Sequence, residues 1–148
     1  MIQVVLYETK YKEQLEQLLK DMSQELFEAG TANLDQFVSN HWCIYLALGG
    51  DEVIGLSSFY YNTYFGLRPP TLGQTYLYVK PAYRRGRASY LLSKQAAFVS
   101  IETNLPLENY YATDASRRIG TRMKGKHLFD AHLYEVEEVK KAYNKLKL

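Results

Sequence analysis

Residues 79–92, with the sequence VKPAYRRGRASYLL, place three arginines and a glycine between a β-prone run and an apolar-periodic segment of helical spacing. The first N–H groups of a helix lack intrahelical partners and carry partial positive charge, so they can bind a phosphate. Gly86 would let the backbone pass close to such an anion. Arg84, Arg85 and Arg87 would add charge-assisted hydrogen bonds. This stretch therefore suggests a pyrophosphate-binding turn, and its local chemistry leaves open a solvated basic turn instead.

The composition is that of an ordinary globular domain. A chain of 148 residues can build one sizeable core, and 47% hydrophobic with 23% charged residues argues against disorder. The net charge of +2 is too small for a general nucleic-acid coat, so any anion site must be local. The sequence shows neither a signal-peptide pattern nor an apolar run long enough to span a membrane. Cys43 is the single cysteine and is interpreted as a buried apolar thiol, so we expect a reducing, cytoplasmic setting.

The elements that must position the basic turn follow from the periodicity of the apolar residues. We expect strands at 2–7, 42–48, 53–64, 74–79 and 110–113, with one or two more within 127–136. We expect helices at 11–30, from Asn33, after residue 88, at 116–124, and in the tail around Val139, Tyr143 and Leu146. Residues 49–52 form the expected hairpin turn, and 66–73 and 104–109 are interpreted as breaks. This order predicts one α/β domain over residues 1–148, with a mixed central β-sheet and helices on both faces.

The basic turn resembles the acyl-coenzyme A binding motif of the GNAT N-acetyltransferase superfamily, and the order of elements resembles that family over nearly the whole chain. The positions in register with the motif are Val79, Pro81, Tyr83, Arg84 and the pair Leu91–Leu92. The motif's glycine falls at Arg87 and its second small position at Ser89, so Gly86 lies one residue early. The resemblance implies a GNAT-type domain that transfers an acetyl group directly from acetyl-CoA to a primary amine.

The resemblance also implies where the coenzyme binds. The pantetheine arm would enter between the strands 74–79 and 110–113, and the turn after the first of them would hold the pyrophosphate. The residues implied in coenzyme binding are Tyr78, Val79, Arg84, Arg85, Gly86, Arg87, Ala88, Ser89 and Asp114.

The usual catalytic groups of the family have no clear counterpart. No tyrosine occurs between Tyr111 and Tyr134, where the family's acid would stand, and the expected strand 74–79 has no carboxylate. Asp114 falls where the family often has an asparagine beside the pantetheine or an ordered water. Tyr76, Tyr78 and Tyr111 are the candidates for proton handling, and Gln74 is a further group that would orient a water. The alternative is a catalytically inactive protein that keeps the GNAT fold to bind a partner.

Candidate acceptor-binding residues lie in the tyrosine-rich stretch 59–70. In the family the acceptor groove runs beside this strand and loop and beside the first two helices. The resemblance therefore implies Tyr60, Tyr61, Tyr64 and Arg68 as acceptor-binding residues, with aromatic packing of a strand as the alternative.

The remaining polar clusters predict less. The histidines at 41, 127 and 132 lack metal-ligand spacing and are interpreted as structural, so no metal is expected. The basic residues of 117–126 are interpreted as a solvated helix face, although coenzyme phosphates, an acidic substrate or nucleic acid would also fit them. The expected partners are coenzyme A and an amine acceptor, either a small molecule or a protein. No membrane or nucleic-acid partner is expected, and a homodimer is left open.

Overall fold

The computed structural model describes residues 1–109, 136–137 and 140–141. The chain divides into two units, 1–113 and 114–148, and the fold described below is that of the first. The expected strand at 110–113, the basic helix and all but the last residue of the expected strand region 127–136 lie outside the described residues. That last residue, Val136, is helical rather than extended. Residues 137 and 140–141 are helical as well, in the segment where a tail helix was expected, whereas Val139, Tyr143 and Leu146 are outside the described residues. The single domain over 1–148 stays a prediction.

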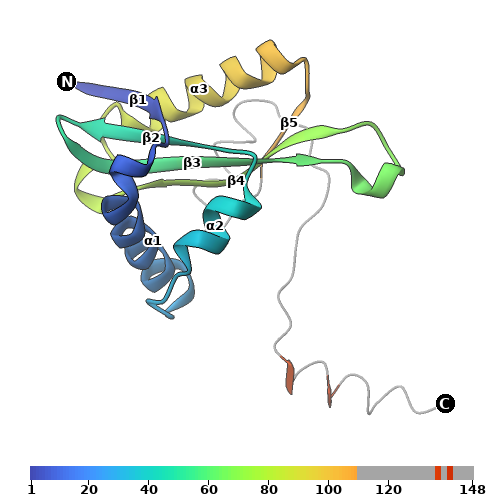
Figure 1. Cartoon of the computed structure of the whole chain (residues 1–148), viewed down its shortest axis with the longest axis horizontal. Helices are drawn as coiled ribbons and strands as arrows, with labels where there is room; N and C mark the ends of the chain where they lie inside the picture. The colour runs from blue at the N-terminus through green and yellow to red at the C-terminus, as the bar shows by residue number, and fades with distance from the viewer. Residues whose placement is uncertain (110–135, 138–139, 142–148) are drawn as a thin grey trace. The chain divides into compact units, whose positions relative to one another are not determined.

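A five-stranded mixed sheet organises the first unit (Figure 1). In spatial order it contains β1 (Ile2–Leu6), β2 (Cys43–Gly49), β3 (Glu52–Asn62), β4 (Thr71–Val79) and β5 (Leu107–Asn109). The first three pairings are antiparallel, and β4 pairs with β5 in parallel. The helices are α1 (Lys12–Phe27), α2 (Leu34–Asn40) and α3 (Ala88–Thr103). The predicted fold class, a mixed sheet with helices on both faces, is confirmed.

Alternation of side chains along the strands gives the sheet two apolar faces. On one face Leu15, Leu18 and Leu19 of α1 pack in a common cluster with Leu46 and Leu56. On the other face the buried side of α3 packs against the sheet in two clusters, formed by Ala47, Ile54, Val79, Ala88 and Leu92 and by Phe59, Leu72, Ala96 and Val99. Figure 1 shows α1 and α2 on one side of the sheet and α3 on the other.

Local sequence signals account for several boundaries. Asn33 caps α2 as expected, because its side chain accepts a hydrogen bond of 2.9 Å from the backbone N–H of Gln36. Gly50 adopts φ 64° in the hairpin turn between β2 and β3, a conformation that suits glycine. Helix α1 ends earlier than expected, because Glu28 rather than Gly30 takes the left-handed C-cap position.

Two strands begin earlier than the sequence indicated. β4 starts at Thr71, directly after Pro70, and β5 starts at Leu107, directly after Pro106. A proline stops a ladder but is tolerated at the first residue of a strand or just before it, so the prolines mark strand starts here rather than loop interiors. Pro106 contributes through its carbonyl, which accepts a hydrogen bond of 2.9 Å from the N–H of Leu72.

Gly55 of β3 lies close to both β4 and α3, so a substitution at this position tests how tightly they pack. A Cβ atom there would lie 2.8 Å from the carbonyl oxygen of Tyr78 and 3.4 Å from Cδ1 of Leu92. We expect Gly55→Ala to lower the free energy of unfolding by about 1–3 kcal/mol through overpacking, measured by urea denaturation. Gly86→Ala is the matched control, because its Cβ would lie 3.4 Å from the Tyr83 oxygen, an ordinary contact, and should shift stability by less than about 1 kcal/mol. Equal losses in the two variants would contradict this account.

Candidate functional site

The turn between β4 and α3 is held by main-chain hydrogen bonds and ends in an uncapped helix. The short 3-10 helix η3 (Pro81–Tyr83) follows Lys80, and the N–H of Gly86 donates to the Tyr83 oxygen at 3.2 Å. Arg87 is the N-cap residue of α3, and its side chain makes no capping hydrogen bond. The first N–H groups of α3 are therefore available to an anion, as the sequence suggested.

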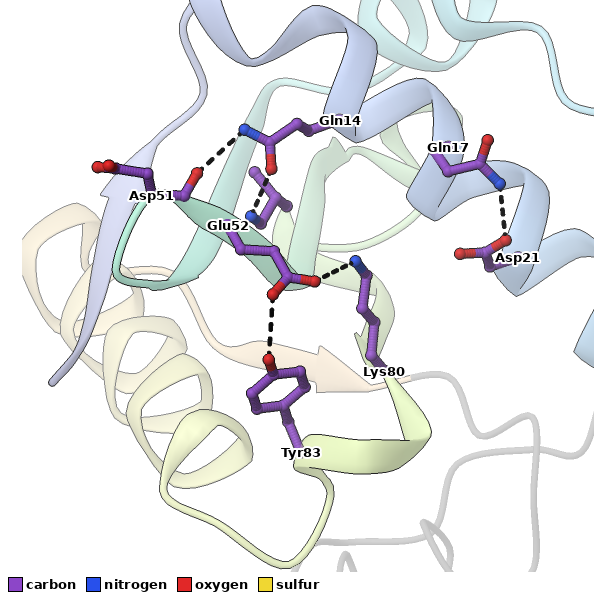
Figure 2. A network of polar contacts seen from close by, with 8 residues as sticks. Gln14, Gln17, Asp21, Asp51, Glu52, Lys80 and Tyr83 are labelled. Atoms are coloured by element: carbon purple, nitrogen blue, oxygen red, sulfur yellow. Dashed lines mark hydrogen bonds and ion pairs between the residues drawn. The ribbon is translucent and has the colours of Figure 1, made fainter.

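A carboxylate of the β2–β3 hairpin anchors the start of this turn. Figure 2 shows Glu52 between Lys80 and Tyr83: the ammonium group of Lys80 lies 2.8 Å from Glu52, and the Tyr83 hydroxyl donates to it at 3.0 Å. The Lys80 contact lowers the pKa of the Glu52 carboxyl below its usual range. Gln14 of α1 in turn fixes the hairpin, since it accepts from the N–H of Val53 at 2.8 Å and donates to the Asp51 oxygen at 3.0 Å.

A second carboxylate, Glu25 of α1, engages Arg84. The Arg84 guanidinium donates to Glu25 Oε2 at 2.6 Å and to the Val79 carbonyl at 2.8 Å. The Tyr78 hydroxyl donates to the same Glu25 oxygen at 2.7 Å. The Arg84 contact lowers the pKa of Glu25, and burial, with the hydrogen bond to Glu25, raises the pKa of Tyr78 to about 12. Arg84 is thus engaged by the fold, whereas Tyr78 is a much weaker acid than a free tyrosine.

Arg85 and Arg87 differ from Arg84. Both are exposed, and neither has a hydrogen-bond or ion-pair partner in the part of the chain that the structure describes. Gly86 between them has no left-handed backbone, so its conformation is open to other residues. The turn therefore offers two guanidinium groups without a partner among the described residues, beside the start of α3.

Among the described residues, which reach only Asn109 in this region, the outer edge of β4 is paired only at its start. β5 pairs with β4 only from Leu72 to Gln74, and the register against β3 shifts between Ser58 and Phe59, which leaves Thr75 as a bulge residue. The N–H of Lys80 donates to the Ile54 oxygen at 2.8 Å. Because peptide groups alternate along an antiparallel ladder, those of Leu77 and Val79 face away from β3.

The sequence analysis implied Tyr78 and Val79 of this strand in coenzyme binding, and their peptide groups face opposite directions. Val79 keeps its N–H for the outer edge, since its carbonyl accepts from Arg84, whereas Leu77 has both groups there. The peptide groups of Tyr78 face β3, and its side chain faces α1. The sequence analysis missed Leu77, although strand alternation around Val79 was the signal that would have found it.

A pocket of about 340 Å³ opens on the face of the sheet that carries α1 and α2. Its walls come from both helices, the segment between them, His41 after α2, and Thr75 and Tyr76 of β4. The Thr75 hydroxyl is buried and has no hydrogen-bond partner among the described residues. The bulge residue Thr75 thus belongs both to β4 and to the wall of a pocket large enough for a ligand.

Part of the tyrosine-rich segment 59–70 forms a separate polar cluster around Glu108. The hydroxyl groups of Tyr64 and Thr71 both donate hydrogen bonds to Glu108, the latter at 2.8 Å. The Arg68 guanidinium lies 3.2 Å from Glu108 and 3.4 Å from the centre of the Tyr64 ring. Neither Tyr64 nor Arg68, nor the half-buried Tyr60 or the exposed Tyr61, lines the pocket. The sequence analysis missed Glu108 because 104–109 was interpreted as a break.

Comparison with solved structures decides the fold type. An acetyltransferase of the GNAT family from Staphylococcus aureus Mu50 matches with a TM-score of 0.68 at 12% identity, over 88% of this chain and 95% of that chain. The chain has the GNAT fold. A ribosomal-protein-alanine N-acetyltransferase from Brucella melitensis biovar Abortus 2308 matches with a TM-score of 0.68 at 12% identity, covering 91% of this chain and 99% of that one. An aminoglycoside N-acetyltransferase in complex with CoA matches with a TM-score of 0.67 at 11% identity, covering 91% and 94%.

No protein-family model and no curated protein sequence matches the chain. At these identities the likeness establishes the GNAT fold, and the activity has to be argued from the site.

Of the proton-handling candidates in this GNAT fold, Tyr76 lines the pocket, whereas Tyr78 is bound to Glu25. Gln74 donates to the Ser57 hydroxyl at 2.8 Å. Tyr111 and Asp114 lie outside the described residues, as do His127, His132 and the basic residues of 117–126.

Three further features of the described residues concern membrane insertion, metal binding and thiol chemistry. None of the helices in this part of the chain is long and apolar enough to cross a membrane. Within it, no group of three or more histidine, cysteine or acidic residues is arranged to hold a metal. Burial raises the pKa of the Cys43 thiol to about 11, which makes it a poor nucleophile.

The Glu25 cluster predicts an acid-sensitive contribution to stability. The pKa of Glu25 is lowered in the folded state, so its contribution is complete above the unfolded-state pKa and is lost as the pH falls through the folded value. We expect the urea midpoint of the wild type to fall more steeply between about pH 5 and pH 3 than that of Glu25→Gln, the usual range for a carboxyl. Glu28→Gln, which removes a carboxylate from the end of the same helix without touching Arg84, should retain the wild-type slope. Parallel pH profiles for wild type and Glu25→Gln would show that this cluster contributes nothing.

Proposed function

We propose that this protein transfers the acetyl group of acetyl-CoA to a primary amine bound in the pocket between α1, α2 and β4. The observation that carries the proposal is the interruption of β4 at Thr75. Among the described residues, β5 pairs with the strand up to Gln74, and beyond the bulge the peptide groups of Leu77 and Val79 face the outer edge and lead toward the turn before α3. One strand thus links these outward peptide groups, a pocket and an uncapped helix start.

The coenzyme would use the strand edge and the turn in sequence. The pantetheine amides would pair with the peptide groups of Leu77 and Val79 as an added strand. The pyrophosphate would accept hydrogen bonds from the N–H groups at the start of α3, around Ala88 and Ser89. The guanidinium groups of Arg85 and Arg87, which have no partner in the described part of the chain, would bind the phosphates, and Arg84 would contribute by fixing the turn through Glu25.

In the proposed reaction both substrates are bound together. The neutral amine attacks the thioester carbonyl carbon, a C–N bond forms, the C–S bond breaks, and the thiolate leaves with a proton. Positioning the amine beside the thioester supplies much of the rate of such a reaction. Asp114 and Tyr111 stay predictions for groups near the thioester. Tyr78, with a pKa of about 12 and its proton shared with Glu25, is poorly suited to proton transfer.

Titration calorimetry with acetyl-CoA tests the coenzyme site. We expect the wild type to bind, and Arg85→Ala and Arg87→Ala each to weaken binding about 10-fold or more, because each removes a charge-assisted hydrogen bond to a phosphate. Lys94→Ala is the control, since it removes an equal charge from an exposed position further along α3. All three variants should unfold like the wild type.

The absence of binding heat at millimolar acetyl-CoA would reject the proposed function. Binding without release of a free thiol in the presence of mixed primary amines would favour the alternative, an inactive protein of the same fold.

A further inference from the structure

His41, the residue between α2 and β2, lines the pocket and has a defined tautomer. Its Nδ1 lies 2.6 Å from the carbonyl oxygen of Phe37. A carbonyl oxygen only accepts hydrogen bonds, so Nδ1 must carry a proton. In the neutral ring the lone pair is therefore on Nε2, and no described residue forms a hydrogen bond with that nitrogen.

Packing holds the imidazole ring in place. The Phe37 ring centre lies 4.3 Å from that of His41, and the Tyr76 ring centre lies 6.4 Å away. Phe37 belongs to α2 and Tyr76 to β4, next to the bulge residue Thr75. The imidazole ring is therefore held in the pocket wall by Phe37 and Tyr76, beside the bulge of β4.

Two carboxylates of α1 are already engaged. Glu25 accepts hydrogen bonds from Arg84 and Tyr78. Asp21 accepts from Gln17 at 2.9 Å (Figure 2). Neither carboxylate lines the pocket, which leaves His41 as its one titratable group other than Tyr76 among the residues that the structure describes.

No carboxylate is among the described residues that line the pocket. Ser23, Asn33, Gln36 and Asn40 are among its neutral polar residues, whereas Leu19, Met22, Phe27 and Phe37 supply apolar surface. A polycationic amine would bring charges that no described side chain of the wall could pair with, at a high desolvation cost. An amine with an apolar body would bury that body against the apolar side chains and leave a single amino group to be deprotonated.

Resting on the proposed acetyl transfer, we propose that the acceptor is a primary amine with an apolar body and that His41 is its general base. Nε2 takes one proton from the ammonium group, and the neutral amine then forms the C–N bond as the thioester C–S bond breaks. The second proton from the attacking nitrogen goes to the departing thiolate, and the imidazolium returns its proton to solvent. One amide, one free thiol and one proton are the net products.

The variant His41→Asn tests the role of the basic nitrogen in catalysis without removing the hydrogen bond to the Phe37 carbonyl. Its amide N–H can replace the Nδ1–H donor to the Phe37 carbonyl, but it has no basic nitrogen. With 2-phenylethylamine as the probe, we expect kcat/KM to fall about 100-fold or more, as for loss of a general base, while the Kd for acetyl-CoA and the urea midpoint are unchanged. In His41→Ala, added imidazole should restore part of the rate, which a purely structural role would not allow. The ¹⁵N spectrum of the wild type should show the Nδ1–H tautomer.

The outcomes distinguish this inference from the function on which it rests. Failure of acetyl-CoA to bind would reject the proposed function itself. If acetyl-CoA binds, the inference is overturned by an Nε2–H tautomer, by His41→Asn activity within about threefold of the wild type, or by preference for spermidine over 2-phenylethylamine, since general-base effects are larger than threefold. Binding of acetyl-CoA without turnover of either amine would overturn it as well.

Discussion

Two carboxylates from distant parts of the sequence hold the turn on which the proposed coenzyme site depends. Glu52 of β3 binds Lys80 and Tyr83 at its start, and Glu25 of α1 binds Arg84 at its middle. These contacts fix the backbone that leads into α3 before any ligand arrives. A binding loop that is already ordered loses less conformational entropy when the ligand binds. The basic residues therefore differ in role, because Lys80 and Arg84 maintain the turn, whereas Arg85 and Arg87 have no partner among the residues that the structure describes.

The interruption of β4 gives this ordered turn its relation to the pocket. A regular β4 paired along its whole length would have no free peptide groups and no bulge. Within the described residues the outer edge is paired with β5 only up to Gln74, and beyond the bulge at Thr75 the side chains of Tyr76 and Tyr78 still face the first two helices. The strand thus presents main-chain groups along its edge and side chains on its α1–α2 face, so two ligands could meet beside Thr75.

The sequence was informative wherever a local rule decides the structure. Helical periodicity located α1 and α3, and Asn33 was correctly predicted to cap α2, because the residues concerned lie within a few positions of one another. The turn before α3 was found through its composition and its resemblance to a family motif. Contacts between distant positions were not accessible in this way. The partner of Arg84 lies 59 residues away, and Glu108 lies 40 residues from Arg68. The tautomer of His41 was missed for another reason: Phe37 is only four residues away, but the hydrogen bond requires the exact end of α2, which periodicity leaves uncertain.

Neutralisation of Lys80 and Arg84 by glutamates also limits the electrostatic reach of this corner. A turn with four uncompensated cations would attract any polyanion through solution, and its affinity would fall steeply with ionic strength. With two of the four charges compensated within the fold, the long-range field is weaker, and recognition depends more on the direction of short hydrogen bonds. The basic turn is therefore better suited to discriminate among phosphate-bearing ligands by shape than to gather them by charge.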